Sequence, residues 1–298
     1  MSEPPDAVRG LAAQREEKRK ARDFAAADEL RDRIRAMGWE PVDTAQGTEF
    51  QPIEKEIPRL RPEDVEPVLE NEPRVGFSVQ WLVQGWPEDV VRGLESFRRH
   101  CGHHPVQHVV VDAAGTDPGL WPEDIELVPL ADDFGWAACR NAGLKRADGH
   151  MVVVIDGSVE AAGDALAPLG DALADPEVGI VGPFGIVTDD LRDFRDSEGP
   201  EVDAIEGYLM AFRREVLQGA GFFDEKFKFY RTADIEFSFR VKDQGLKAVV
   251  VPLPLARHEH RMWANTPEDR REKLSKRNFY RFLDRWRGRT DLTVGGKG

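Results

Sequence analysis

The chain has 298 residues, of which 41% are hydrophobic and 32% are charged, and its formal net charge is −14. This composition supports one large globular domain or two smaller ones, and it excludes a chain that is disordered throughout. An acidic chain of this kind is not a general binder of nucleic acids or anionic membranes. No apolar stretch approaches the roughly 18 residues of a membrane-spanning helix, so we expect no membrane span.

The N-terminus lacks the basic start and the apolar run of a secretion signal. Cys101 and Cys139 are the only cysteines in the sequence, and two residues so far apart form neither a disulfide framework nor a zinc ribbon. We therefore expect a cytoplasmic protein that contacts a membrane, if at all, only peripherally.

The first 38 residues predict two short helices. The first, about Ala7–Ala21, is strongly charged, and Asp23 is a suitable N-cap for the second. The second helix carries an apolar stripe formed by Phe24, Ala27, Leu30, Ile34 and Met37. Gly38 favours its end. A hairpin this small buries too little apolar surface to be stable alone, so it must dock on another part of the chain.

The composition changes between residues 40 and 72, where ten acidic residues face three basic ones and prolines are frequent. Such a stretch is typical of a partly extended linker. We therefore expect three parts: a helical hairpin over 1–48, an acidic linker over 49–73 and a larger domain over 74–298.

From Arg74 onward strands and helices alternate, which favours an α/β domain with a largely parallel sheet. The expected strands are Val75–Val83, Val106–Val111, Ile125–Pro129, Met151–Ile155, Gly179–Val181 and Lys247–Val251. The expected helices are Glu88–His100, Trp136–Ala147 and Ala165–Ala174. Ligands of such sheets bind at the carboxyl ends of the strands.

Two aspartates stand at such carboxyl ends, Asp112 and Asp156. A carboxylate at either place can hydrogen-bond a ribose, and Asp156 is also suited to hold a divalent ion, because hard cations prefer oxygen ligands. The alternative for each is a turn, since Gly115 and Gly157 follow closely.

Asp234 and Glu236 lie at the start of a predicted helix. The helix dipole favours an ionised carboxylate there, which suits a general base that removes a proton from a hydroxyl. The alternative is an N-terminal helix cap.

His258 and His260 follow the last expected strand and are spaced to bind a metal or a phosphate, unless they belong to an exposed polar loop. Residues 257–289 hold eleven basic and five acidic residues. This excess indicates an anionic partner such as a diphosphate, or else a solvated helix face.

Taken together, residues 74–289 resemble the family 2 glycosyltransferases with the GT-A fold, because several motifs occur in the family's order. They are the nucleotide-binding turn Asp112–Asp117, the G-x-x-x-x-R-N-x-G helix Gly135–Gly143, the D-x-D position Asp156–Ser158, the acceptor-side residues Glu206–Gly207 and Arg213–Glu215, the E-D-x-D position Ala233–Glu236 and the basic helix Lys276–Leu283.

The resemblance implies a GT-A domain, a mostly parallel sheet flanked by helices. It also implies inverting transfer of a sugar from a nucleotide-diphosphate donor to a glycan, lipid-linked or small-molecule acceptor. Asp234 would be the catalytic base. The residues implied in donor-nucleotide binding are Val83, Asp112, Arg140 and Asp156. Those implied on the acceptor or diphosphate side are Glu206, Gly207, Glu236, His258 and His260.

Two positions depart from the family pattern. Ser158 stands where the third D-x-D residue is usually a carboxylate, and Ala233 replaces the acidic residue before the base. A magnesium or manganese ion would then be held by Asp156 together with Glu160 or His258, or cationic residues of 257–261 would neutralise the diphosphate instead. These departures motivate a second hypothesis, a binding or scaffold protein that keeps the fold without turnover.

The N-terminal segment, Arg15–Asp32 with Gly38 and Asp43–Thr48, resembles the C-terminal helical end of cysteinyl-tRNA synthetases. The H-I-G-H motif of their catalytic domain is absent from the sequence, so we expect no synthetase activity. A third hypothesis is therefore an RNA-associated protein guided by the hairpin, although we favour a hairpin that only packs on the linker.

Overall fold

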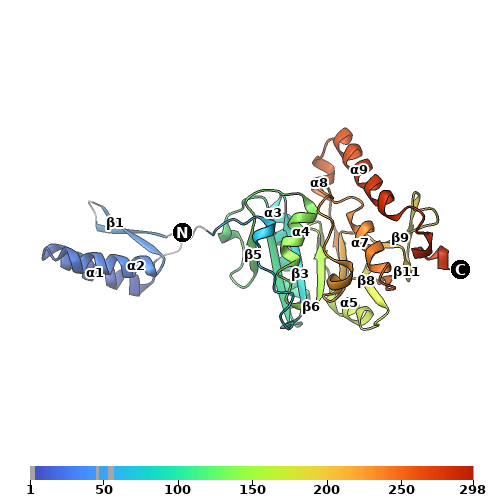
Figure 1. The fold of residues 1–298 in the computed structure, drawn as a ribbon. Coiled ribbons are helices and arrows are strands. Elements are labelled where there is room, and N and C mark those ends of the chain that lie inside the picture. Colours follow the sequence, from blue (N-terminus) through green and yellow to red (C-terminus); the bar gives the residue numbers. More distant parts are fainter. Residues whose placement is uncertain (1–3, 45–46, 53–56, 298) are drawn as a thin grey trace. The chain divides into compact units, whose positions relative to one another are not determined.

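The computed structural model describes residues 4–44, 47–52 and 57–297 (Figure 1). The chain divides into two compact units, Met1–Pro58 and Arg59–Gly298. Residues 45–46 of the segment that resembles a synthetase, and 53–56 of the expected linker, lie outside the described residues. Within the described ranges, none of the helices has both the length and the apolar character needed to cross a membrane.

The first unit is a helical pair with a β-hairpin: α1 (Asp6–Lys20), α2 (Phe24–Ala36), β1 (Trp39–Thr44) and β2 (Gly47–Pro52). Asp23 caps α2 by accepting a hydrogen bond from the amide of Ala26, as expected. The expected apolar stripe is only partly buried: Phe24 and Met37 are exposed at its two ends.

A small core and an ion pair hold this unit together. The buried residues of the core are Val8, Ala12, Ile34 and Trp39. The guanidinium of Arg15 donates to the Asp43 carboxylate at 2.8 Å, which fastens β1 to α1. The two helices therefore dock on the hairpin β1–β2, which the sequence pattern did not predict.

The centre of the second unit is a sheet of eight strands. They are β3 (Val75–Val83), β4 (Val106–Asp112), β5 (Glu126–Pro129), β6 (Gly149–Ile155), β8 (Val178–Gly182), β11 (Glu201–Val202), β13 (Leu209–Arg213) and β14 (Lys247–Val250). Their order is β11-β14-β8-β13-β6-β3-β4-β5. The pairs among β6, β3, β4 and β5 are parallel, as is β8–β14, whereas β13 and β11 run antiparallel to their neighbours.

Smaller sheets and helices complete the unit. β9 (Gly185–Thr188), β10 (Phe194–Ser197) and β12 (Ala204–Ile205) form a three-stranded sheet, and β7 (Val159–Ala161) pairs with β15 (Leu255–Arg257). The helices are α3 (Pro87–Cys101), α4 (Trp136–Leu144), α5 (Leu166–Leu173), α6 (Val216–Ala220), α7 (Ala233–Lys242), α8 (Arg261–Asn265) and α9 (Glu268–Trp286). The helices expected over 88–100 and 165–174 are confirmed within one residue at each end, and the one expected over 136–147 ends at Leu144.

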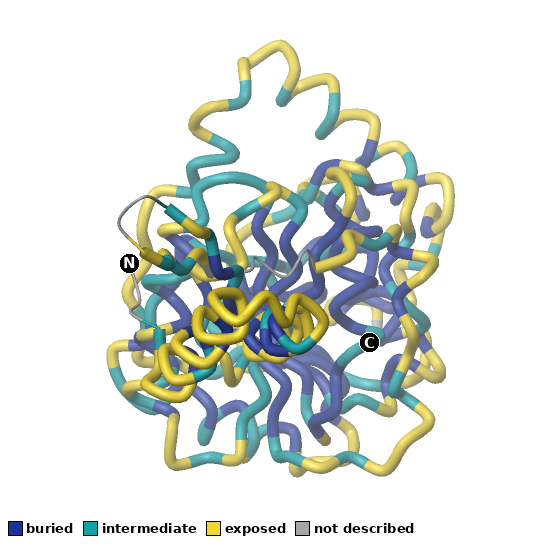
Figure 2. The backbone as a smooth tube through the Cα atoms, turned by 90° about the vertical axis from the view of Figure 1, so that its left-hand side faces the viewer, coloured by how far each residue is buried: buried dark blue, intermediate teal, exposed yellow. Residues whose placement is uncertain are grey.

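Alternation along the central strands produces a core on each face of the sheet. On β6, Val153 and Ile155 join a cluster that includes residues of α3 and α5, whereas Val152 and Val154 join one that includes residues of α4 and α7. Buried stretches of the backbone such as these are coloured dark blue in Figure 2. An α/β architecture with helices on both faces of a mainly parallel sheet is therefore confirmed.

The expected linker is shared between the two units. Its first residues belong to β2, while Leu60 forms a parallel bridge with Leu130 beyond the end of β5. The ammonium of Lys145 donates to the carbonyl of Pro62 at 2.6 Å. The prolines predict an extended backbone. They do not indicate that the peptide groups of this backbone form hydrogen bonds with the rest of the second unit.

Candidate functional site

Two cavities share a wall at the carboxyl end of β6. The larger has a volume of about 730 Å³ and the smaller about 50 Å³. The residues that line both are Trp136, Asp156, Ser158 and His260. The structure therefore places Asp156, an expected site residue, between two spaces at the sheet edge where ligands of α/β folds bind.

Asp156 is paired with His260 across this wall. β15 pairs with β7, and the amide of His258 donates to the carbonyl of Ser158, so residues 258–260 return to the turn after β6. The Asp156 carboxylate accepts from the amide of Ser158 at 2.8 Å and lies 3.2 Å from the His260 Nε2. Burial alone would raise the pKa of Asp156, but the contacts with His260 and Ser158 outweigh it and lower that pKa to about 2.

Arg140 provides a buried positive charge behind Asp156. Its guanidinium donates to the carbonyl of Gln80 in β3 and to the carbonyl of Ile155, the last residue of β6. It also lies over the ring of Trp136, 5.6 Å from the ring centroid. Burial lowers the pKa of Arg140 to about 10, and the charge of Asp156 opposes this effect, so the side chain stays cationic at neutral pH.

Asp234 faces the larger cavity from the first turn of α7. Its carboxylate accepts hydrogen bonds from the amides of Gly207 at 2.8 Å and of Ile235 at 2.9 Å. Burial raises its pKa, and the two amides, which favour the charged form, only partly offset this effect. A carboxylate with a raised pKa is a better proton acceptor than an ordinary aspartate.

Glu206 and Gly207, the expected acceptor-side residues, line the same cavity. Burial raises the pKa of Glu206, and the nearby charge of Asp234 raises it further. A Cβ at position 207 would lie 3.0 Å from the Cβ of Asp234, so glycine allows the backbone to approach the carboxylate closely. Glu206 and Asp234 therefore line the same cavity wall, where the charge of Asp234 acts on Glu206.

Aromatic and cationic side chains line the rest of the larger cavity, and of these Arg257 belongs to the segment 257–261, which was expected at the site. Arg257 lies over the ring of Tyr208, 3.8 Å from its centroid, and Arg231 lies 5.3 Å from the ring of Trp263. The ring of Tyr230 meets His260 edge-on at 4.6 Å. Single aromatic residues in a sequence do not distinguish a cavity wall from a core, so no local pattern would have identified them.

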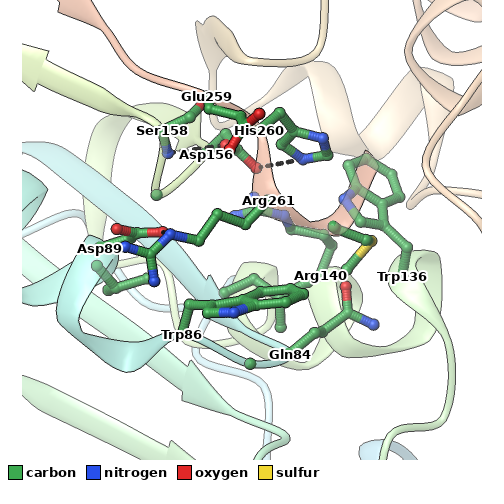
Figure 3. A pocket seen from close by; sticks show the side chains of 15 residues that line it. Gln84, Trp86, Asp89, Trp136, Arg140, Asp156, Ser158, Glu259, His260 and Arg261 are labelled. Atoms are coloured by element: carbon green, nitrogen blue, oxygen red, sulfur yellow. Dashed lines mark hydrogen bonds and ion pairs between the residues drawn. The ribbon is translucent and has the colours of Figure 1, made fainter. Parts of the chain in front are cut away.

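Arg261 spans the smaller cavity (Figure 3). Its guanidinium pairs with Asp89 at 3.2 Å and also with Glu88, both in the first turn of α3. Trp86, which precedes this helix in a left-handed conformation, lines the same cavity. Arg261 belongs to the segment 257–261, whose cationic residues were expected near a diphosphate, and it brings a positive charge to this space.

The Asp112 carboxylate is hydrogen-bonded within the turn that follows β4. It accepts from the amides of Ala114, Gly115 and Thr116 at 3.0, 3.1 and 2.9 Å, and Arg59 lies 3.4 Å away. Val83 lies opposite Asp112 in the parallel register, and its carbonyl accepts from the amide of Ala113. Neither residue lines the two cavities. This geometry fits the turn considered for Asp112, and donor-nucleotide binding by Val83 and Asp112 stays a prediction.

Three other expected site residues form ion pairs outside the two cavities. Glu236 is buried between α7 and α9, where it pairs with Arg240 and Arg285, both at 3.0 Å. Glu160 and His258 pair with each other at 2.6 Å. The structure therefore does not bring Glu160 and His258 together with Asp156.

Asp156 and His260 are the side chains at this site that fit a divalent ion. They present a carboxylate oxygen and an imidazole nitrogen at a cavity wall, and manganese and magnesium accept such ligands. Among the described residues, no group of three close His, Cys, Asp or Glu ligand atoms is found here. An ion at this place would therefore need oxygen ligands from a bound substrate or from water.

Three solved structures are similar to this chain. GalNAc-T7 with UDP, GalNAc and Mn²⁺ is 15% identical, with a TM-score of 0.59, over 74% of this chain and 49% of that chain. The mannosyltransferase PcManGT from Pyrobaculum calidifontis, in complex with GDP-Man and Mn²⁺, is 25% identical, with a TM-score of 0.47, over 66% and 59%. S. aureus TarS 1-349 in complex with UDP is 14% identical, with a TM-score of 0.47, over 70% and 72%.

The likeness to GalNAc-T7 shows the GT-A fold, as the sequence motifs imply. This chain spans about half the length of that protein. No protein-family model and no curated protein matches the sequence. The narrower family 2 resemblance and the resemblance of the N-terminus to a synthetase stay predictions.

Proposed function

We propose that this chain is a glycosyltransferase that moves a sugar from a nucleotide-diphosphate donor to an acceptor hydroxyl with inversion at the anomeric carbon. The observation that carries the proposal is the position of Asp234. On a GT-A fold, this carboxylate of raised pKa faces a cavity of about 730 Å³ whose wall is also formed by the Asp156–His260 pair. GalNAc-T7, which shares the fold, was solved with UDP, GalNAc and Mn²⁺.

The donor diphosphate belongs at the shared wall, between Asp156 and the cationic side chains. Arg261 and His260 line the smaller cavity, and the buried Arg140 guanidinium holds a positive charge behind it. These groups are fixed before the reaction and would stabilise the negative charge that develops on the leaving diphosphate.

Asp156 and His260 would hold a divalent ion in this arrangement. Such an ion supplies additional positive charge to the diphosphate. Arg140, His260 and Arg261 already bring positive charge to the diphosphate. This fits the presence of Ser158 in place of the third D-x-D carboxylate. We therefore propose that manganese strengthens donor binding through Asp156 and His260, without Glu160 or His258.

The reaction needs one proton acceptor, and Asp234 would supply it. Its carboxylate removes the proton from the acceptor hydroxyl while that oxygen attacks the anomeric carbon. The bond from this carbon to the diphosphate oxygen breaks on the opposite face, and the nucleotide diphosphate leaves with the bonding electrons. The Gly207 and Ile235 amides hold Asp234 in place for this step.

The acceptor would occupy the larger cavity. The faces of Tyr208 and Trp263 are partly covered by Arg257 and Arg231, so the wall offers both aromatic surface and hydrogen-bond donors to a polyhydroxylated molecule. A glycan, a lipid-linked sugar and a small molecule all remain candidates for the acceptor.

The proposal is tested by release of nucleotide diphosphate from a panel of UDP-, GDP- and dTDP-sugars, with a set of sugar acceptors and with manganese. We expect one donor to be turned over by the natural chain and by Asp171→Asn, whose exposed carboxylate lies in α5 outside both cavities. The matched change Asp234→Asn should lower turnover by about 10²–10⁴-fold. Equal turnover in Asp234→Asn would remove this residue from the mechanism, and binding of a donor without any turnover would favour the scaffold hypothesis.

A further inference from the structure

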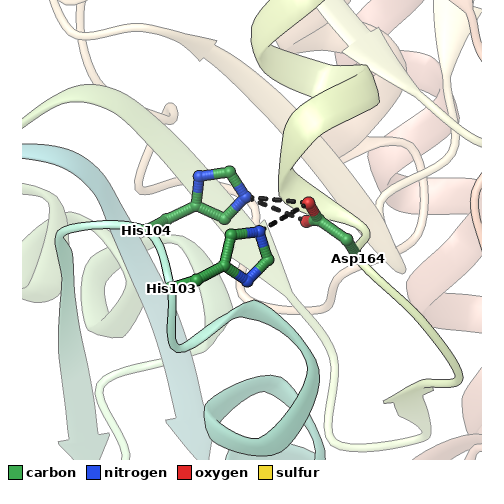
Figure 4. Close-up of side chains that lie close together, drawn as sticks. All are labelled: His103, His104 and Asp164. Carbon is green, nitrogen blue, oxygen red and sulfur yellow. Dashed lines mark hydrogen bonds and ion pairs between the residues drawn. The ribbon is translucent and has the colours of Figure 1, made fainter.

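Two histidines and an aspartate converge at a place remote from both cavities (Figure 4). The Nε2 atoms of His103 and His104 lie 3.0 and 2.9 Å from the Asp164 Oδ2. One ligand atom from each of the three side chains lies within 4.8 Å of the others. His103 and His104 precede the first residue of β4, whereas Asp112 stands at its last, so the group belongs to the amino end of that strand.

The fold fixes the position of each member of this group. His103 and His104 lie in the short turn between α3 and β4, and the His104 ring packs edge-on against Phe77, with the ring centroids 5.6 Å apart. The Asp164 Oδ1 accepts from the amides of Leu166 and Ala167 at 3.0 and 3.2 Å, at the start of α5. These two bonds orient the carboxylate so that Oδ2 faces both imidazoles. Hydrogen-bonded outer contacts of this kind are typical of ligands at metal sites.

We propose that His103, His104 and Asp164 form a zinc-binding site that ties the α3–β4 turn to the first turn of α5. Two imidazole nitrogens and one carboxylate oxygen are a ligand set that Zn²⁺ prefers, with a water molecule in the fourth position.

The two distances between the imidazoles and the carboxylate fit such an ion. Ligand bonds of about 2.0–2.1 Å in a tetrahedral site separate neighbouring ligand atoms by about 3.3 Å. Both imidazole nitrogens lie within a few tenths of an ångström of that separation from Oδ2. Small side-chain rotations would therefore admit the ion without a change of backbone. Because His103 is largely exposed and His104 and Asp164 are partly so, an ion from solution has access.

Without a metal, the same three side chains would only be hydrogen-bonded to one another. Both imidazoles would then carry a proton on Nε2, with His103 donating to Oδ2 and His104 donating to both carboxylate oxygens. The two states differ in a measurable way. Zinc binding would replace those protons. It would also join two segments that lie about 60 residues apart in the chain.

The test is a zinc titration of the metal-free full chain by calorimetry, together with its thermal unfolding. His103→Ala and Asp164→Asn remove one ligand each, and asparagine still caps a helix, so the second variant keeps the start of α5. His100→Ala, at the end of α3, is the matched control outside the group. His260→Ala removes the other place where a metal is proposed.

We expect one zinc ion bound by the natural chain, by His100→Ala and by His260→Ala, with a matching rise in the unfolding temperature. We expect at least about a tenfold weaker affinity and no such rise in His103→Ala and Asp164→Asn. The proposal would be overturned by equal zinc affinity in all variants, by loss of the zinc only in His260→Ala, or by no binding to the natural chain.

Discussion

Three aspartates at the carboxyl edge of the sheet have very different surroundings. Three backbone amides donate to Asp112, so its carboxylate stabilises a turn. Asp156 faces an imidazole, which keeps it ionised. Asp234 keeps two amide bonds but is buried enough that its pKa rises. The same side chain thus serves as a turn former, a proposed ion ligand and a proposed base, and its neighbours decide which.

Asp234→Asn should lower the catalytic rate without lowering the stability of the fold. Removal of the general base lowers kcat by about 10²–10⁴-fold. The free energy of unfolding at pH 7 should be unchanged or higher, because the folded chain no longer keeps a carboxylate charged in a buried place. Urea unfolding and turnover measured on the same preparations check both outcomes. A large loss of stability would mean that Asp234 mainly caps α7.

The activity should also depend on pH through Asp234. A base must be deprotonated to act, and burial raises the pKa of this carboxyl above the usual aspartate value of about 3.9. Activity should therefore fall as the pH drops through a midpoint that is higher than that value. A profile of kcat/KM between pH 4 and 8 measures the midpoint. Activity that persists unchanged to the low end of this range would contradict the assignment.

At the scale of elements, the contact between α7 and α9 depends on Glu236. Its carboxylate is 2% exposed and pairs with Arg240 on its own helix and with Arg285 on α9. Arg240 is itself buried and also donates to the carbonyls of Ala220 and Phe222. Glu236 therefore holds together the two helices that flank the larger cavity.

Glu236→Ala should destabilise the second unit by about 3–5 kcal/mol, because it leaves the buried Arg240 without its ionic partner. Chemical unfolding measures this change. Asp243→Ala, which removes the exposed partner of Arg289, is the control and should cost about 1 kcal/mol or less. Similar small effects of both changes would favour a role for Glu236 at the acceptor instead.

Gly143, the last glycine of the G-x-x-x-x-R-N-x-G motif, allows α4 to approach the sheet. A Cβ there would collide with the Gln80 amide and lie 2.6 Å from the Val111 Cγ2. Gly143→Ala should therefore cost about 1–3 kcal/mol. Gly170→Ala, whose nearest contact would be the Phe77 Cζ at 3.2 Å, should cost less. Thermal unfolding of the two variants compares them, and the reverse order would contradict a packing role for Gly143.

The central strands could be predicted because they are apolar, β-branched runs with clear ends, such as Met151–Ile155 within β6. The hairpin β1–β2 was missed because its proline and acidic residues are typical of a linker. Asp156 and Asp234 could be selected by their places at a strand end and a helix start. Their surroundings could not, since His260 reaches Asp156 from 104 residues away through the pairing of β15 with β7.

At the scale of the whole molecule, the chain joins two units of different character. The first is small, with a core of a few residues and ion pairs between its helices and its hairpin. The second carries the sheet, both cavities and the His103–His104–Asp164 group. The proposed transferase function needs only residues of the second unit. Association with RNA through the first unit stays a prediction.

The central claim is that the second unit binds a nucleotide-sugar donor at the wall formed by Asp156 and His260. Calorimetric titration of the full chain with UDP, GDP and dTDP, each with and without manganese, tests it most directly. We expect one of these nucleotides to bind at a single site, manganese to strengthen the binding, and His260→Ala to remove this strengthening. No binding of any of the three nucleotides, with or without manganese, would contradict it.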